Sequence, residues 1–123
     1  MTPTEARSIL LVEDDAGIRE SVADCLESEG YRVAPASNGM EGLDWLRREG
    51  RPDLIVLDLV MPVMNGAEFL NALRGDSALR DIPVVLMTAA MPSSSQPLPR
   101  ATGYLSKPFE LSELLDAIER YAG

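Results

Sequence analysis

The sequence predicts an α/β fold built on a doubly wound, five-stranded parallel sheet. Five short apolar runs alternate along the chain with stretches whose apolar residues recur at helical spacing, and the connections are short. Such alternation is typical of a parallel sheet covered by helices on both faces. A length of 123 residues suits one domain, so we expect a single domain over residues 1–123.

The five predicted strands are short and rich in apolar residues, as strands buried on both faces are. We place them at Ser8–Glu13, Tyr31–Pro35, Leu54–Asp58, Pro83–Thr88 and Gly103–Ser106.

Four other stretches have the periodicity of amphipathic helices. We expect Gly30 and Gly50 to end the first two, Ser37 or Asn38 to cap the second, and the third to start after Asn65-Gly66. The periodic apolar residues are Ile18, Val22, Cys25 and Leu26; Met40, Leu43, Trp45 and Leu46; Phe69, Leu70 and Leu73; and Leu111, Leu114, Leu115, Ile118 and Tyr121.

The alternation breaks between the fourth and fifth strands. Residues 90–102 contain Pro92, Pro97, Pro99 and three consecutive serines, where a further helix would be expected. Proline inside a helix removes a backbone hydrogen bond, and serine favours turns. We therefore expect a Pro/Ser-rich loop at about 90–102 in place of the fourth helix.

Composition and charge exclude several classes of function. The formal net charge is −9, which argues against nucleic-acid binding because a phosphate backbone requires a basic surface. The chain has no histidine, so a His-based triad and a His-ligated zinc site are excluded. A single Cys25, no signal-peptide pattern and no apolar run long enough to span a membrane lead us to expect a cytoplasmic protein.

Acidic residues end two of the predicted strands. Glu13 and Asp14 follow the first strand, and Asp58 ends the third. The carboxyl ends of parallel strands meet at one sheet edge, where ligands bind in open α/β sheets. Carboxylates held close together repel one another, and an oxygen-preferring divalent ion such as Mg²⁺ relieves that repulsion. Asp15 fits a simpler role as a helix cap.

Two further residues are expected at the same edge. Thr88 closes the fourth strand, and Lys107 follows the fifth. The lysine could pair with Asp58 or hold a phosphoryl oxygen. Carboxylates, a hydroxyl and an ammonium group at successive strand ends together suit phosphoryl transfer.

With these motifs the chain resembles the receiver domains of two-component response regulators, almost from end to end. The motifs are Leu-Val-Glu-Asp-Asp at 11–15, Asp-Leu-Val-Met-Pro-Val-Met-Asn-Gly at 58–66, Met-Thr-Ala at 87–89 and Lys-Pro-Phe at 107–109. The resemblance implies the flavodoxin-like strand order 2-1-3-4-5.

The resemblance also implies a metal and a phosphoacceptor. Asp58 would accept a phosphoryl group from a phosphohistidine on a partner histidine kinase or histidine phosphotransfer protein. Asp14, Asp58 and the main-chain carbonyl of Val60 would bind Mg²⁺ directly, and Glu13 would bind it through a water molecule.

The remaining implied roles concern the switch. Thr88 and Lys107 would hold the phosphoryl oxygens, the Lys107–Pro108 bond would be cis, and Tyr104 would be the aromatic switch residue. Phosphorylation would then drive a conformational change that a downstream partner protein reads. We expect no turnover of an external metabolite and no output domain in this chain.

Three other classes of protein are alternatives to a phosphorylated receiver domain. A phosphorylation-independent interaction module with a vestigial site is kept open by the missing helix. A haloacid dehalogenase-like phosphatase would need a second acid two residues after the nucleophile, where this chain has Val60. A flavin-binding protein of the same fold would need hydrogen-bond donors where the first loop carries acids.

Overall fold

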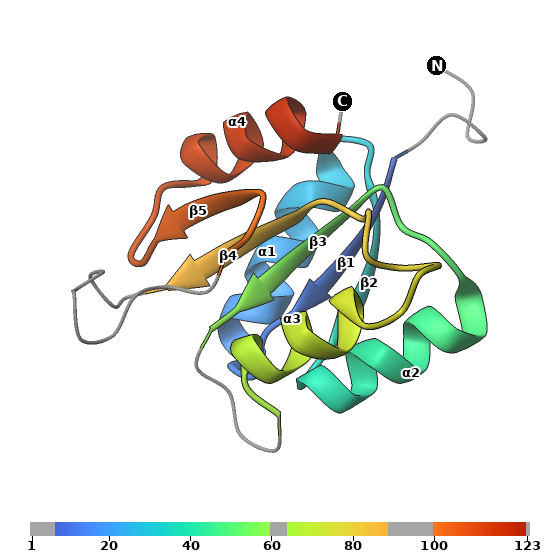
Figure 1. The fold of residues 1–123 in the computed structure, drawn as a ribbon. Helices are drawn as coiled ribbons and strands as arrows, with labels where there is room; N and C mark the ends of the chain where they lie inside the picture. The colour runs from blue at the N-terminus through green and yellow to red at the C-terminus, as the bar shows by residue number, and fades with distance from the viewer. Residues whose placement is uncertain (1–6, 60–63, 89–99, 123) are drawn as a thin grey trace.

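The computed structural model describes residues 7–59, 64–88 and 100–122, which form a parallel sheet between two layers of helices (Figure 1). The strand order is β2-β1-β3-β4-β5, which confirms the predicted fold class. The strands are β1 (Ser8–Val12), β2 (Arg32–Ala36), β3 (Leu54–Asp58), β4 (Val84–Thr88) and β5 (Gly103–Ser106). The helices in the described residues are α1 (Ala16–Ser28), α2 (Gly39–Glu49), α3 (Gly66–Arg74) and α4 (Leu111–Ala122).

The sheet separates two hydrophobic cores. Helices α1 and α4 cover one face, and α2 and α3 cover the other (Figure 1). Side chains alternate along each strand, so Leu54 and Val56 of β3 join the first core while Ile55 and Leu57 join the second. All five residues of β3 are buried. The central strand that ends in Asp58 is therefore held rigidly from both sides.

Polar side chains define where three of the helices begin. Asp15 accepts a hydrogen bond from the main-chain N–H of Ile18 and caps α1. Asn38, rather than Ser37, caps α2. At α3, Asn65 and Glu68 form a reciprocal capping box.

Glycines and strand ends agree with the prediction to within a residue or so. Gly30 and Gly50 have φ angles of 95° and 98°, which other residues rarely adopt. The second strand begins at Arg32, because the N–H of Tyr31 still bonds to Leu26 at the end of α1.

The loop predicted at about 90–102 lies mostly outside the described residues. Its last three residues, Arg100–Thr102, are described and contain no helix or strand. No helix in the described part of the chain is both long and apolar enough to cross a membrane.

Gly66 lets α3 start against the end of β3. A Cβ atom at this position would lie 2.8 Å from the Leu59 Cα and 2.9 Å from the Asp58 main-chain oxygen. Both neighbours are backbone atoms, which cannot rotate away as a side chain can. A side chain here would therefore displace the segment that carries Asp58.

We expect Gly66→Ala to lower the free energy of unfolding by about 1–3 kcal/mol, as overpacking does. Urea denaturation would measure the change. Gly75→Ala is the matched control, because its Cβ would make only ordinary contacts. The control should shift stability by no more than about 1 kcal/mol, toward greater stability. Equal effects of the two substitutions would contradict this account of Gly66.

Candidate functional site

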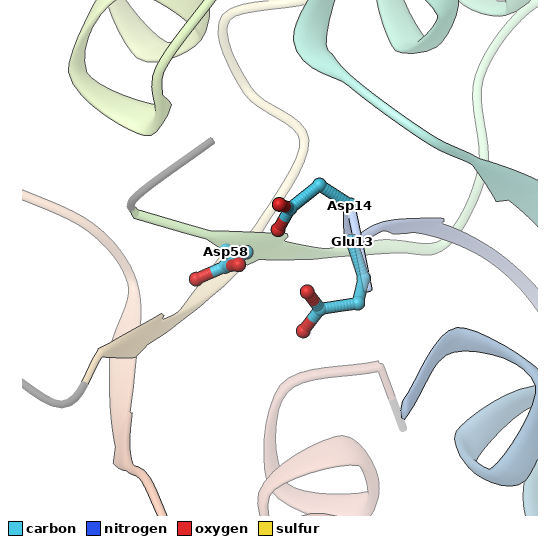
Figure 2. Close-up of side chains that lie close together, drawn as sticks. All are labelled: Glu13, Asp14 and Asp58. Carbon is cyan, nitrogen blue, oxygen red and sulfur yellow. The ribbon is translucent and has the colours of Figure 1, made fainter. Parts of the chain in front are cut away.

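Three carboxylates converge at the carboxyl edge of the sheet (Figure 2). Strands β1 and β3 are neighbours, with Val12 opposite Leu57, so Glu13 and Asp14 emerge beside Asp58. One carboxylate oxygen of each of the three residues lies within 4.8 Å of the others. Glu13 and Asp58 are buried, whereas Asp14 is exposed. The structure thus brings together the three acids that the sequence singled out.

Both the carboxylate and the main chain of Glu13 have polar partners. One oxygen of its carboxylate lies 2.8 Å from the Lys107 ammonium, and the other accepts a hydrogen bond of 3.1 Å from the Asp15 main-chain N–H. The main-chain N–H of Glu13 donates to the Ala36 carbonyl. A buried carboxylate is tolerated only when it is paired and hydrogen-bonded, and Glu13 meets both conditions.

Lys107 joins the carboxylate cluster from the loop after β5. Its ammonium lies 3.4 Å from Asp58, slightly farther than from Glu13, and its main-chain N–H donates to the Thr88 carbonyl. Burial lowers the pKa of Lys107, but the contacts with Glu13 and Asp58 outweigh burial and raise it overall. The lysine therefore remains a cation. The Lys107–Pro108 bond is cis, as the resemblance implied.

Within the cluster, Asp58 has a raised pKa. Burial, followed by the neighbouring Glu13 carboxylate, raises the pKa of Asp58 from 3.8 to about 7, although Lys107 acts in the opposite direction. Asp14 adds to the increase. Without a further cation, Asp58 is thus held near the midpoint of its titration at neutral pH.

The donor set fits a divalent ion that prefers oxygen ligands. Three carboxylates face a single ammonium, so the cluster carries excess negative charge that a second cation would offset. Asp14 and Asp58 offer oxygens for direct ligation. Both oxygens of Glu13 already have partners, which suits an indirect contact. The expected ligand Val60 lies outside the described residues.

Thr88 and Tyr104 occupy neighbouring strands at this end of the sheet. Thr88 is buried at the end of β4, one residue beyond Met87, which lies opposite Asp58. Tyr104 in β5 is 48% exposed, and its hydroxyl accepts a hydrogen bond of 3.0 Å from the Ala101 main-chain N–H. The Tyr104 ring therefore faces outward in this structure.

Two contacts were not predicted from the sequence. Lys107 does pair with Asp58 at 3.4 Å, one of the two roles considered for it, but it also makes a shorter contact of 2.8 Å with Glu13. Arg19 donates to the main-chain carbonyls of Glu13 and Asp14, and no motif pointed to it. An arginine one turn into the helix after an acidic loop is the available signal, but arginine at such a position is more often an ordinary surface residue.

A largely apolar pocket of about 680 Å³ adjoins the site. Residues of α1, among them Ile18 and Val22, form one wall, and Pro108 and Phe109 form the other. Lys107 also lines this pocket, so the apolar surface is continuous with the charged site.

Comparisons with known proteins place this geometry in context. The sequence profile of the response regulator receiver domain matches residues 9–119. The polar-differentiation response regulator DivK of Brucella anthropi is 36% identical over 120 residues, which cover 95% of this chain and 97% of DivK. DivK of Brucella ovis is 34% identical over the same coverage.

Solved structures of response regulators and receiver domains are also similar to this chain. The chemotaxis protein CheY4 of Vibrio cholerae superposes with a TM-score of 0.83 at 33% identity, covering 94% of this chain and 98% of CheY4. The receiver domain of the sensor histidine kinase PA1611 of Pseudomonas aeruginosa, with magnesium coordinated in its active-site cleft, gives 0.87 at 30% identity. That similarity covers 96% of this chain and 98% of the PA1611 chain.

The raised pKa of Asp58 predicts a pH-dependent difference between the wild type and Asp58→Asn without metal. From pH 4 to 7 the unfolded chain releases this proton while the folded chain keeps it, so the wild type loses stability as pH rises. Asparagine does not titrate. We expect the variant to be more stable by roughly 2–4 kcal/mol at pH 8 and by less than about 1 kcal/mol at pH 4.5. Urea denaturation at both pH values tests this, and a difference independent of pH would contradict it.

Proposed function

Because this chain belongs to the response regulator receiver domain family, we propose that it is a phosphoacceptor switch in which Asp58 takes a phosphoryl group from a partner phosphohistidine. The family acts in two-component signalling through phosphorylation, and its partners are histidine kinases or phosphotransfer proteins. The observation that carries the proposal is a buried Asp58 carboxylate flanked by Glu13, Asp14 and Lys107. In this proposal the chain turns over no external metabolite.

Transfer begins with attack of an Asp58 carboxylate oxygen on the phosphorus atom. The phosphorus–nitrogen bond of the phosphohistidine breaks, and its electron pair remains on the imidazole of the partner. Asp58 must be ionised to attack, and the charge of Lys107 favours that state. The ammonium then lies beside the oxygens on which negative charge collects, as in other phosphoryl transfers.

Asp14 and Asp58 would hold Mg²⁺ directly, and Glu13 would hold it indirectly. When bound, the ion supplies positive charge that favours the ionised nucleophile and offsets the charge of the transferring group. The residues of the chain do the rest: β1 and β3 orient the three carboxylates, and burial of Asp58 limits access of water to its carboxylate.

The switch itself would use the hydroxyl of Thr88 and the ring of Tyr104. A phosphoryl group on Asp58 brings negative charge and hydrogen-bond acceptors to the edge where Thr88 ends β4. Movement of Thr88 toward the phosphoryl group would open space for Tyr104, which faces outward on the adjacent strand. Two such side-chain positions form a two-state element that a local charge biases.

The apolar pocket beside Lys107 supports a protein donor. A phosphohistidine on a helix of the partner would reach Asp58 if apolar side chains of that helix occupied the pocket between α1 and Phe109. A cytoplasmic location belongs to the same proposal, and the free thiol of Cys25 fits a reducing compartment.

Intact mass spectrometry after incubation with acetyl phosphate tests the phosphoacceptor. We expect one Mg²⁺-dependent phosphoryl addition in the wild type and none in Asp58→Asn. Asp44→Asn is the matched control, because Asp44 is an exposed acid on α2. It should label like the wild type. Labelling of Asp58→Asn to wild-type level would refute the assignment, and no labelling of any protein would favour the phosphorylation-independent interaction module.

Lys107→Ala should separate phosphorylation from metal binding. Loss of the ammonium removes the cation beside the transferring group, so we expect phosphorylation at saturating Mg²⁺ to slow by at least about tenfold. Mg²⁺ affinity should stay the same or rise, because the ammonium repels the ion. Stopped-flow labelling and calorimetric Mg²⁺ titration measure the two effects. A large loss of Mg²⁺ affinity would contradict the role given to Lys107.

A further inference from the structure

Arg19 in α1 is bound to the main chain of the acidic loop. One nitrogen of its guanidinium, Nη1, donates to the carbonyl of Glu13 at 2.8 Å and to that of Asp14 at 3.3 Å. These carbonyls belong to two of the three residues of the carboxylate cluster. Hydrogen bonds from a charged donor are stronger than those between neutral groups.

The partners of Arg19 are unusual for an arginine in an acidic chain. The sequence has 20 acidic residues against 11 basic ones, yet within the described residues Arg19 forms no salt bridge with a carboxylate. Its charge reaches Glu41, where two hydrogen bonds from Ser37 and then the charge of Arg19 lower the pKa. The hydrogen bonds of the Arg19 guanidinium go to the loop carbonyls of Glu13 and Asp14.

The contact completes the restraint of residues 13–15. The N–H of Glu13 is held by Ala36, its carbonyl by Arg19, and Asp15 caps the helix on which Arg19 lies. A main chain held at successive peptide groups has little freedom to rotate. The directions in which the side chains of Glu13 and Asp14 leave the backbone are therefore set.

We propose that Arg19 is a positioning residue for the divalent-ion site, acting through the main chain of Glu13 and Asp14 rather than by touching the ion. This inference rests on the proposed function, because it assumes that the carboxylate cluster binds Mg²⁺. Groups that orient metal ligands from outside the coordination sphere typically change metal affinity by about 10–100-fold when they are removed.

Whether Mg²⁺ affinity falls or rises when Arg19 is removed distinguishes a positioning role from a purely electrostatic one. A guanidinium near the site repels Mg²⁺, so its removal would tighten binding if charge alone mattered. Positioning predicts the reverse, because a loosened loop must be ordered again when the ion binds. A residue that only stabilises the fold would lower the unfolding midpoint of the metal-free protein and leave the Mg²⁺ affinity unchanged.

Calorimetric Mg²⁺ titration of Arg19→Ala, Arg19→Lys and Arg47→Ala tests the proposal. Arg47 lies in the last turn of α2, where it is exposed and pairs with Asp44, and it serves as the matched control. We expect Arg19→Ala to bind Mg²⁺ about tenfold more weakly than the wild type. Arg19→Lys should lie between them, since it keeps the charge but loses the planar fork. Arg47→Ala should bind as the wild type does.

The metal-free unfolding midpoint of each variant is measured in parallel, so that Mg²⁺ affinities are compared only between folded proteins. If Arg19→Ala does not fold, Arg19→Lys carries the test alone. Wild-type or tighter Mg²⁺ binding by the folded Arg19 variants would overturn the inference and leave the proposed function intact. Failure of the wild type and Arg47→Ala to bind Mg²⁺ would overturn both.

Discussion

The ammonium group of Lys107 is the interaction on which the site depends. It comes from the loop after β5, reaches past the end of β4, and contacts carboxylates delivered by β1 and β3. Without it, Glu13 and Asp58 would be two buried acids side by side, with no ion-pair partner for either carboxylate among the described residues. Removing one partner of a buried ion pair typically costs about 3–5 kcal/mol. The two acids can lie side by side at the sheet edge because one ammonium group contacts both carboxylates.

One lysine does not neutralise three carboxylates, and this imbalance gives the site its chemistry. The pKa of Asp58 rises to about 7, because burial and Glu13 outweigh Lys107. A cation bound at this cluster would offset the excess negative charge. Closely packed apolar side chains fill both cores beneath the cluster. In the proposed function, a local change of charge would act on two groups at this edge, Thr88 and Tyr104.

The fold and the list of candidate residues were accessible from the sequence. Apolar periodicity located every strand and helix of the described residues, because burial of each element depends on its own pattern. In a parallel sheet all carboxyl ends meet at one edge, so the acids at positions 13, 14 and 58 were expected to converge. The sequence could not decide which of two adjacent residues caps a helix. Ser37 and Asn38 both suit the cap of α2, and only the backbone geometry selects Asn38.

The order of elements, the buried faces and the set of chemical groups at one edge could thus be read from the amino-acid pattern. Which of these groups are in contact depends on how the folded layers pack. Lys107 pairs most closely with Glu13, 94 positions away, and Arg19 binds main-chain carbonyls that no side-chain motif reveals. Periodicity is a local property of the chain. Pairing at the site instead depends on register, on loop conformation and on where long side chains can reach, and these are set only when the layers pack.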